Sequence, residues 1–159
     1  ALRNWLPYKK EIIDTDNGEA DGFFINHDYP IKVFAMMPEG LSLWCGSKEV
    51  IPNSTLLLGE LPKSFESNEG VIFYSEQITT NSSAIKALLK LKELGVDSNR
   101  ILLITPICSN RGLNEIAKLF PNQVIYTSCI DEEDENTKLL IPGIGNPLLR
   151  LSTIFNNKN

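Results

Sequence analysis

The sequence predicts a single α/β domain built on a parallel sheet, and three observations support this. Strand-like and helix-like segments alternate along the chain, as they do in βαβ units. The chain has 159 residues, of which 42% are hydrophobic, which is enough for one domain with a buried core. We find no internal repeat, no low-complexity linker and no domain boundary. Residues 1–159 are therefore expected to form one domain.

Short apolar segments separated by turn residues are the predicted strands of this sheet. They cover residues 31–37, 55–58, 71–74, 101–105 and 124–130. Glycine, proline, serine and asparagine cluster between them, which is typical of loops. Residues 59–70, between two of these strands, are predicted to form a polar loop.

Three helices are predicted from apolar residues at helical spacing. The most regular one covers residues 82–94, with an apolar face of Ala84, Ala87, Leu88, Leu91 and Leu94. An earlier helix follows the turn that ends at Gly40, with an apolar face of Leu41, Trp44 and Cys45. A later helix, stopped by Pro121, has an apolar face of Leu113, Ile116, Ala117 and Phe120.

Charge and length exclude two classes of partner. Fifteen Lys and Arg against 20 Asp and Glu give a net charge of −5, and the basic residues form no block. Nucleic acid is therefore not an expected partner, because phosphate-backbone binding needs clustered positive charge. Every apolar stretch is much shorter than the roughly 20 residues of a membrane span, so no membrane insertion is expected.

Histidine and cysteine content restricts the chemistry further. His27 is the one histidine, so a two-histidine metal site cannot form. Cys45, Cys108 and Cys129 lack C-x-x-C spacing, which excludes a zinc or redox motif and favours a reducing compartment. We expect all three to be small buried side chains. The acidic run over residues 131–135 is predicted to be a solvated turn, and no metal site is expected.

The last third of the chain carries motifs in a recognisable order. These are Val124-Ile125-Tyr126-Thr127 with Ile130-Asp131, then Ile141-Pro142-Gly143-Ile144-Gly145-Asn146, then Arg150 and Thr153. The pattern resembles uracil phosphoribosyltransferases, in which a Tyr-Thr-x-x-Ile-Asp strand precedes a Pro-Gly-Leu-Gly-Asp loop that holds uracil. Further matches occur at Thr80, Ser83-Ala84-Ile85 and Gly40-Leu41, and at residues 2–7, which are most similar to the cyanobacterial and plastid branch.

The resemblance implies a type I phosphoribosyltransferase fold, a Rossmann-like parallel sheet with the substrate at the carboxyl ends of its strands. Such enzymes transfer a ribosyl group from phosphoribosyl pyrophosphate to uracil. A fold does not by itself establish an activity, so each part of the site must be compared with this sequence.

The family's phosphate loop, Asp-Pro-Met-Leu-Ala-Thr-Gly-Gly-Ser, aligns with residues 75–83, called the phosphate loop below. Its vestigial site residues are Ser75, Thr79, Thr80, Asn81, Ser82 and Ser83. Ser75 replaces the leading aspartate, and Asn81 and Ser82 replace the two glycines that let backbone N–H groups close around a phosphate. Glu76 adds a negative charge. We expect this loop to bind neither phosphoribosyl pyrophosphate nor magnesium.

The pyrophosphate arm of the family, Leu-Arg-Ala-Gly-Leu, is also altered. The equivalent residues are Met37, Pro38, Glu39, Gly40 and Leu41. The arginine has been lost and a glutamate stands beside its position. An arginine clamp is a charge-assisted, geometrically specific contact that proline cannot replace. The resemblance therefore implies a lost pyrophosphate arm.

The uracil loop is the best-preserved part of the pattern. Its residues are Ile141, Gly143, Gly145, Asn146 and Arg150. Main-chain recognition of uracil survives if the turn keeps its conformation, but Asn146 replaces an aspartate of the family. Gly143 and Gly145 are equally explained as turn glycines that need positive φ.

A long hairpin of the family is shortened to residues 59–70. The resemblance assigns this hairpin to the site and to the dimer, so a weakened homodimer is expected. The amino-terminal segment carries apolar residues that are candidates for a partner surface, namely Trp5, Leu6, Tyr8, Phe23 and Phe24. Ordinary packing of these residues on their own domain is the alternative. The first residues read as the end of a helix that began earlier.

These departures favour a non-catalytic member of the family that serves as a structural or regulatory subunit of a larger complex. An active uracil phosphoribosyltransferase and a weak uracil or nucleotide sensor are the alternatives. No cofactor is expected, and magnesium is required only by the enzyme alternative. The 15 Asn and 17 Ile against 6 Ala indicate an AT-rich, organellar genome. A plastid is therefore the expected compartment, in the stroma or on the stromal face of a thylakoid complex.

Overall fold

A seven-stranded, mostly parallel sheet forms the centre of the molecule, with strand order β4-β3-β5-β7-β8-β9. The computed structural model describes residues 6–26, 28–38, 40–146 and 150. The parallel strands are β3 (Ile31–Ala35), β4 (Thr55–Leu58), β5 (Gly70–Tyr74), β7 (Ile101–Ser109) and β8 (Val124–Glu133). The short β6 (Gln77–Ile78) is added to β7, and β9 (Leu140–Ile141) pairs antiparallel with the end of β8. The predicted α/β class is confirmed.

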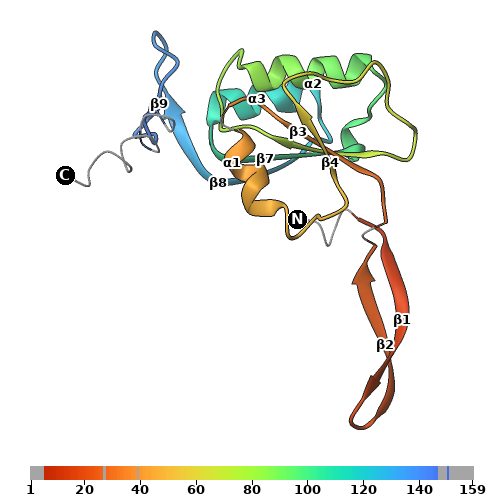
Figure 1. Ribbon diagram of the computed structural model, residues 1–159. Helices are drawn as coiled ribbons and strands as arrows, with labels where there is room; N and C mark the ends of the chain where they lie inside the picture. The colour runs from red at the N-terminus through yellow and green to blue at the C-terminus, as the bar shows by residue number, and fades with distance from the viewer. Residues whose placement is uncertain (1–5, 27, 39, 147–149, 151–159) are drawn as a thin grey trace, which may run out of the picture.

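Helices cover both faces of the sheet. Figure 1 shows α2 (Ser83–Glu93) and α3 (Asn110–Leu119) on one face and α1 (Gly40–Ser47) on the other. Phe73 of β5 belongs to the cluster under α2 and α3, whereas its neighbour Ile72 belongs to the cluster that includes residues of α1. Successive side chains of a strand point to opposite faces. The central strands are therefore apolar on both faces, as a covered parallel sheet requires.

The predicted helix over residues 82–94 is confirmed as α2, within about one residue at each end. Ala84, Leu88 and Leu91 are fully buried against the sheet. The helix ends at a left-handed glycine, Gly95, whose φ is +78°. The N–H of Val96 donates to the carbonyl of Leu91 at 3.0 Å, so the helix end closes in the manner of a Schellman motif.

Strands β7 and β8 are longer than predicted, and this changes the position of the acidic run. Parallel pairing continues as far as Ser109 and Asp131, so residues 131–133 belong to β8 rather than to a turn. Glu133 is only 5% exposed. The prediction of a solvated turn is therefore wrong for residues 131–133, because they are paired as the last residues of strand β8.

A separate antiparallel hairpin of β1 (Tyr8–Thr15) and β2 (Gly18–Ile25) precedes the sheet. It projects away from the body at the lower right of Figure 1, and every residue of β1 is exposed. This hairpin was not predicted, although Asn17-Gly18 between strand-like residues is a known hairpin signal. Residues 59–69, by contrast, contain no strand.

Several predicted burials are wrong. Leu6, a candidate for a partner surface, is 4% exposed and packs in the cluster on the α1 face, as the alternative of ordinary packing expected. Cys45 and Cys129, expected to be buried, are exposed, while Cys108 is buried. Cys45 lies on the outer side of the short α1, and Cys129 lies on the end of β8 beyond the covered part of the sheet. Ala117 of α3 is also exposed.

Some expectations concern residues outside the described part of the chain. They are the helix end at residues 1–5 with Trp5, the single histidine at 27, and Glu39 of the pyrophosphate arm. None of the helices that the structure describes is long and apolar enough to cross a membrane.

Candidate functional site

The phosphate loop follows β5 at the carboxyl end of the sheet and borders an open cavity of about 310 Å³. The cavity is lined by Met36, Met37, Ser75, Glu76, Gln77 and Ser83. Among the described residues of this lining, Glu76 is the one with a charged side chain. A site at this edge of a parallel sheet is the usual place for a ligand, but the charge in this cavity is negative.

The first part of the phosphate loop is held against β7. Ser75 is 3% exposed, and its N–H donates to the carbonyl of Ile104 at 3.1 Å. Its Oγ donates to the carbonyl of Gln77 at 3.0 Å. Gln77 and Ile78 then pair with β7 as β6. Ser75, which replaces the family's aspartate, therefore uses its hydroxyl to shape the backbone.

The middle of the phosphate loop is a tight turn. Asn81, at the position of the family's first glycine, has a φ of +54°, a conformation that asparagine tolerates better than most residues. Ser82 donates its N–H to the carbonyl of Thr79 at 3.2 Å. Gly112 of α3 packs on this turn, because a Cβ there would lie 3.0 Å from the carbonyl carbon of Thr79. Ser83, which begins α2, is exposed.

Two backbone donors of the phosphate loop are satisfied by carboxylates of the chain itself. The N–H of Thr80 donates to Glu133 Oε2 at 2.9 Å, and the N–H of Asn81 donates to Glu115 Oε2 at 2.9 Å. Glu133 comes from the end of β8, and Glu115 comes from α3. Negative groups thus already lie where loop N–H groups point.

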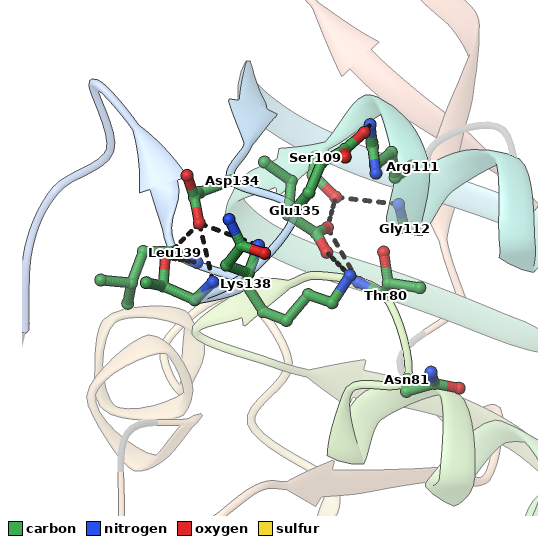
Figure 2. Close-up of polar contacts among 12 residues, drawn as sticks. Thr80, Asn81, Ser109, Arg111, Gly112, Asp134, Glu135, Lys138 and Leu139 are labelled. Carbon is green, nitrogen blue, oxygen red and sulfur yellow. Dashed lines mark hydrogen bonds and ion pairs between the residues drawn. The ribbon is translucent and has the colours of Figure 1, made fainter.

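Glu133 receives a second hydrogen bond, from Ser109 Oγ at 2.5 Å. Ser109 also accepts from the N–H of Gly112 at 2.8 Å, which caps α3 (Figure 2). Burial acts to raise the pKa of Glu133, but hydrogen bonds from Ser109 and Thr80 and the positive charge of Lys138 hold that pKa below its ordinary range. Glu133 is therefore ionised at neutral pH.

The segment of the pyrophosphate arm keeps a structural glycine. A Cβ on Gly40 would lie 2.8 Å from the carbonyl oxygen of Tyr74, so glycine lets α1 begin close against β3 and β5. Met37 is 45% exposed at the cavity, and Pro38 follows it in the position of the family's arginine. The described part of this segment therefore offers no cation.

The uracil loop follows the β8–β9 hairpin in the chain. Gly143 and Gly145 have φ values of +63° and +69°, as expected of turn glycines. Gly143 donates its N–H to Asp131 Oδ2 at 2.8 Å. Arg150 donates to the carbonyl of Ile144 at 2.9 Å and, through its backbone N–H, to that of Asn146 at 3.1 Å. Ile141 is 54% exposed. Arg150 thus stabilises the turn through main-chain contacts.

The end of β8 contacts both the uracil loop and the phosphate loop. This role was not predicted from the sequence. Asp131 holds the uracil loop and Glu133 holds the phosphate loop. Glu115 and Ser109 were also not predicted as site residues. Side chains alternate along a strand, so residues 131 and 133 lie on one face. A predicted strand extended by three residues, to 133, would have placed both carboxylates at this end of the sheet.

The fold and the position of these loops define an α/β protein of the type I phosphoribosyltransferase kind. The AQ2163 protein from Aquifex aeolicus has a similar solved structure, with a TM-score of 0.76 over 96% of this chain and 79% of that chain, at 18% sequence identity. At that identity the likeness concerns the fold alone.

The family model for uracil phosphoribosyltransferase matches residues 1–147, and the chain belongs to this family. It is 24% identical to the uracil phosphoribosyltransferase of Nostoc sp. over 91% of this chain and 74% of that protein. It is 29% identical to the chloroplastic uracil phosphoribosyltransferase of Arabidopsis thaliana, over 91% of this chain and 54% of that protein. The uracil phosphoribosyltransferase of Fervidobacterium nodosum is also 29% identical, with 91% and 75% covered.

Proposed function

We propose that this protein is a non-catalytic member of the uracil phosphoribosyltransferase family that serves as a structural or regulatory subunit of a larger complex. One observation carries the proposal: the Thr80 and Asn81 N–H groups of the phosphate loop donate to Glu133 and Glu115. A phosphate needs such N–H groups free. The chain's own carboxylates occupy them instead.

The charges around the cavity support the same conclusion. Phosphoribosyl pyrophosphate is polyanionic, and its binding needs cations or free hydrogen-bond donors. Glu76 lines the cavity, and the carboxylate of Glu133 accepts the N–H of Thr80 in the loop. Two like charges 4 Å apart repel by about 1 kcal/mol in water and about 4 kcal/mol at the effective dielectric constant near a protein surface. Ligand binding is therefore opposed at the position where the family's loop binds phosphate.

The β1–β2 hairpin is the proposed partner surface. Tyr8, Ile12 and Phe23 are 50%, 69% and 67% exposed. A two-stranded hairpin is at best marginally stable in water unless something covers it, and clustered exposed apolar residues mark interaction sites. Acidic residues gather toward its turn, at Asp14, Asp16, Glu19 and Asp21. We propose a different protein with an apolar groove bordered by basic side chains as the partner.

A plastid remains the proposed compartment. The chloroplastic relative of Arabidopsis thaliana supports it, together with the organelle-like composition.

Isothermal titration calorimetry tests the loss of catalysis. Phosphoribosyl pyrophosphate with magnesium at millimolar concentration should give no saturable heat, and uracil should not be converted to its nucleotide. The uracil phosphoribosyltransferase of Nostoc sp. is the positive control. A micromolar dissociation constant for this chain would favour the active-enzyme alternative, and saturable heat with uracil alone would favour the sensor alternative.

Purification of the native protein tests the partner. Size-exclusion chromatography with mass spectrometry should find the protein in a much larger assembly. Phe23→Ser should remove the protein from that assembly. Leu139→Ser should not, because it changes a similarly exposed residue (63%) outside the β1–β2 hairpin. Recovery only as a free homodimer that converts uracil would contradict the proposal.

A further inference from the structure

The carboxylate of Glu133 is bound by the phosphate loop in the way that an external anion would be. Its Oε2 accepts from a backbone N–H of the loop and from the hydroxyl of Ser109. The residue is 5% exposed. Convergent N–H and O–H donors in a water-poor position are the usual arrangement for stabilising an oxyanion.

The second oxygen of this carboxylate is less well satisfied than the first. Oε1 is buried and accepts no hydrogen bond from the described residues, and Lys138 Nζ lies 3.9 Å away. Ser82 Oγ in the loop is also buried without a hydrogen-bond partner in the described part of the chain. Buried polar atoms normally have partners, so Glu133 Oε1 and Ser82 Oγ leave the hydrogen bonding at this position incomplete.

The hairpin that carries Glu133 is fixed over the loop by local contacts. Asp134 Oδ1 accepts from the backbone N–H groups of Asn136 and Thr137 at 3.0 and 2.7 Å. Glu135 forms an ion pair with Arg111 of α3. Figure 2 shows Asp134, Glu135 and Lys138 on the side of the hairpin that approaches Thr80 and Ser109. The Asp134 hydrogen bonds therefore shape the turn after β8, and the ion pair of Glu135 with Arg111 connects this turn to α3.

We infer that Glu133 is an internal ligand that occupies the anion position of the phosphate loop, and that the β8–β9 hairpin is the element that keeps it there. The inference rests on the proposed loss of catalysis and adds a cause to it. The loop keeps its backbone shape, with a left-handed residue at position 81, and is closed by a carboxylate. Removing that carboxylate should make the loop available to a small oxyanion.

Inorganic phosphate is the probe, and the full chain is used. Binding is followed by calorimetry and by the backbone amide signals of Thr80 and Asn81 in nitrogen-15 spectra. The variants are Glu133→Ala, Glu133→Gln and the control Glu132→Gln, which removes the neighbouring exposed carboxylate of the same strand. Glu133→Gln keeps the size of the side chain and serves as the test if the alanine variant does not fold.

The wild type and Glu132→Gln should bind phosphate weakly and without a change at Thr80. Glu133→Ala should bind at least about tenfold more tightly, the effect expected of freeing donors for a charge-assisted contact, with the Thr80 amide signal shifting along the titration. Glu133→Gln should show a smaller gain of the same kind, because a neutral amide is a weaker internal ligand.

Folded Glu133 variants that bind phosphate no better than Glu132→Gln would overturn the inference. Tight phosphate binding by the wild type would also overturn it. Neither result depends on the test of the proposed function, because that test asks whether the wild type binds phosphoribosyl pyrophosphate with magnesium. A wild type that is inactive while Glu133→Ala gains no phosphate binding would refute the internal ligand and leave the loss of catalysis standing.

Discussion

Glu69 and Glu133 are buried carboxylates at opposite ends of the same sheet, and their surroundings differ. Glu69 precedes β5 at the amino end; its Oε1 lies 2.7 Å from Lys32 Nζ, and its Oε2 accepts the N–H of Glu66 at 2.9 Å. Glu133 ends β8 at the carboxyl end, with two hydrogen bonds to one oxygen and Lys138 Nζ 3.9 Å from the other.

The amino-end network is complete and ties a loop to the sheet. Arg100 Nε donates to the carbonyl of Glu69 at 2.9 Å, and the Lys32 ammonium lies 5.2 Å from the centre of the Phe65 ring. These contacts hold the end of this segment, residues 65–69, in place without a strand. This fold therefore closes one end of the sheet with a matched ion pair, whereas at the other end a carboxylate accepts the Thr80 N–H and the Ser109 hydroxyl with its nearest ammonium 3.9 Å away.

The largest expected effect is at the amino end. Lys32→Met should lower the free energy of unfolding by about 3 kcal/mol, because it leaves Glu69 buried without its cation. Urea denaturation measures the change. Lys9→Met removes a lysine from the exposed pair of Lys9 and Glu11 and should cost less than about 0.5 kcal/mol. Equal losses in the two variants would mean that burial does not distinguish the pairs.

Ser109→Ala should lower the free energy of unfolding by about 2 kcal/mol. The change removes the cap of α3 and a donor to Glu133 at once. Ser82→Ala is the matched control at the start of α2, where the serine makes no capping hydrogen bond, and should change the value by less than about 0.5 kcal/mol. Thermal or urea unfolding of both variants provides the measurement. A larger loss of unfolding free energy in Ser82→Ala than in Ser109→Ala would contradict the role given to Ser109.

Acid should weaken the folded state through both carboxylates. Burial acts most strongly to raise the pKa of Glu69, but the hydrogen bond from Lys32, the N–H of Glu66 and the charges of Lys32 and Arg100 lower it below the ordinary 4.5. The pKa of Glu133 is also lowered. A folded-state pKa below the unfolded one means that the folded state binds fewer protons. The stabilisation is therefore present above the unfolded pKa and is lost as pH falls through the folded one.

Unfolding free energies measured from pH 7 to pH 3 check this sign. Glu69→Gln and Glu133→Gln should each flatten the decline at low pH, whereas Glu132→Gln should leave the curve closer to that of the wild type. An unchanged slope in both buried variants would show that other groups cause the acid sensitivity.

The smallest expected effect is that of Lys138→Met. The Lys138 ammonium is 3.9 Å from Glu133 Oε1, and its side chain is 45% exposed, so it contributes at most a screened attraction. We expect a loss below about 0.5 kcal/mol in chemical denaturation, in contrast to Lys32→Met. A loss as large as that of Lys32→Met would show that Glu133 depends on a cation after all.

Most of the sheet and α2 were predictable because their signal is local. The stripe of Ala84, Leu88 and Leu91 is visible in the sequence at helical spacing, and the central strands are continuous apolar runs. The β1–β2 hairpin was missed although its turn residues were present, because every residue of β1 remains exposed. Such a strand has no buried face that would give a regular alternation in hydrophobicity.

The family, the mostly parallel α/β fold and the replacement of the family's loop residues at positions 75, 81 and 82 could all be recognised without a structure. The sequence did not determine which groups meet the loop. Glu133 is 53 residues from Thr80 in the chain and Glu115 is 34 residues from Asn81, and these pairs are brought together by the parallel pairing of β7 with β8 and the packing of α3. Only the tertiary structure could place a glutamate of an acidic run on the loop's N–H groups, because burial of a charge depends on the donors that distant segments supply.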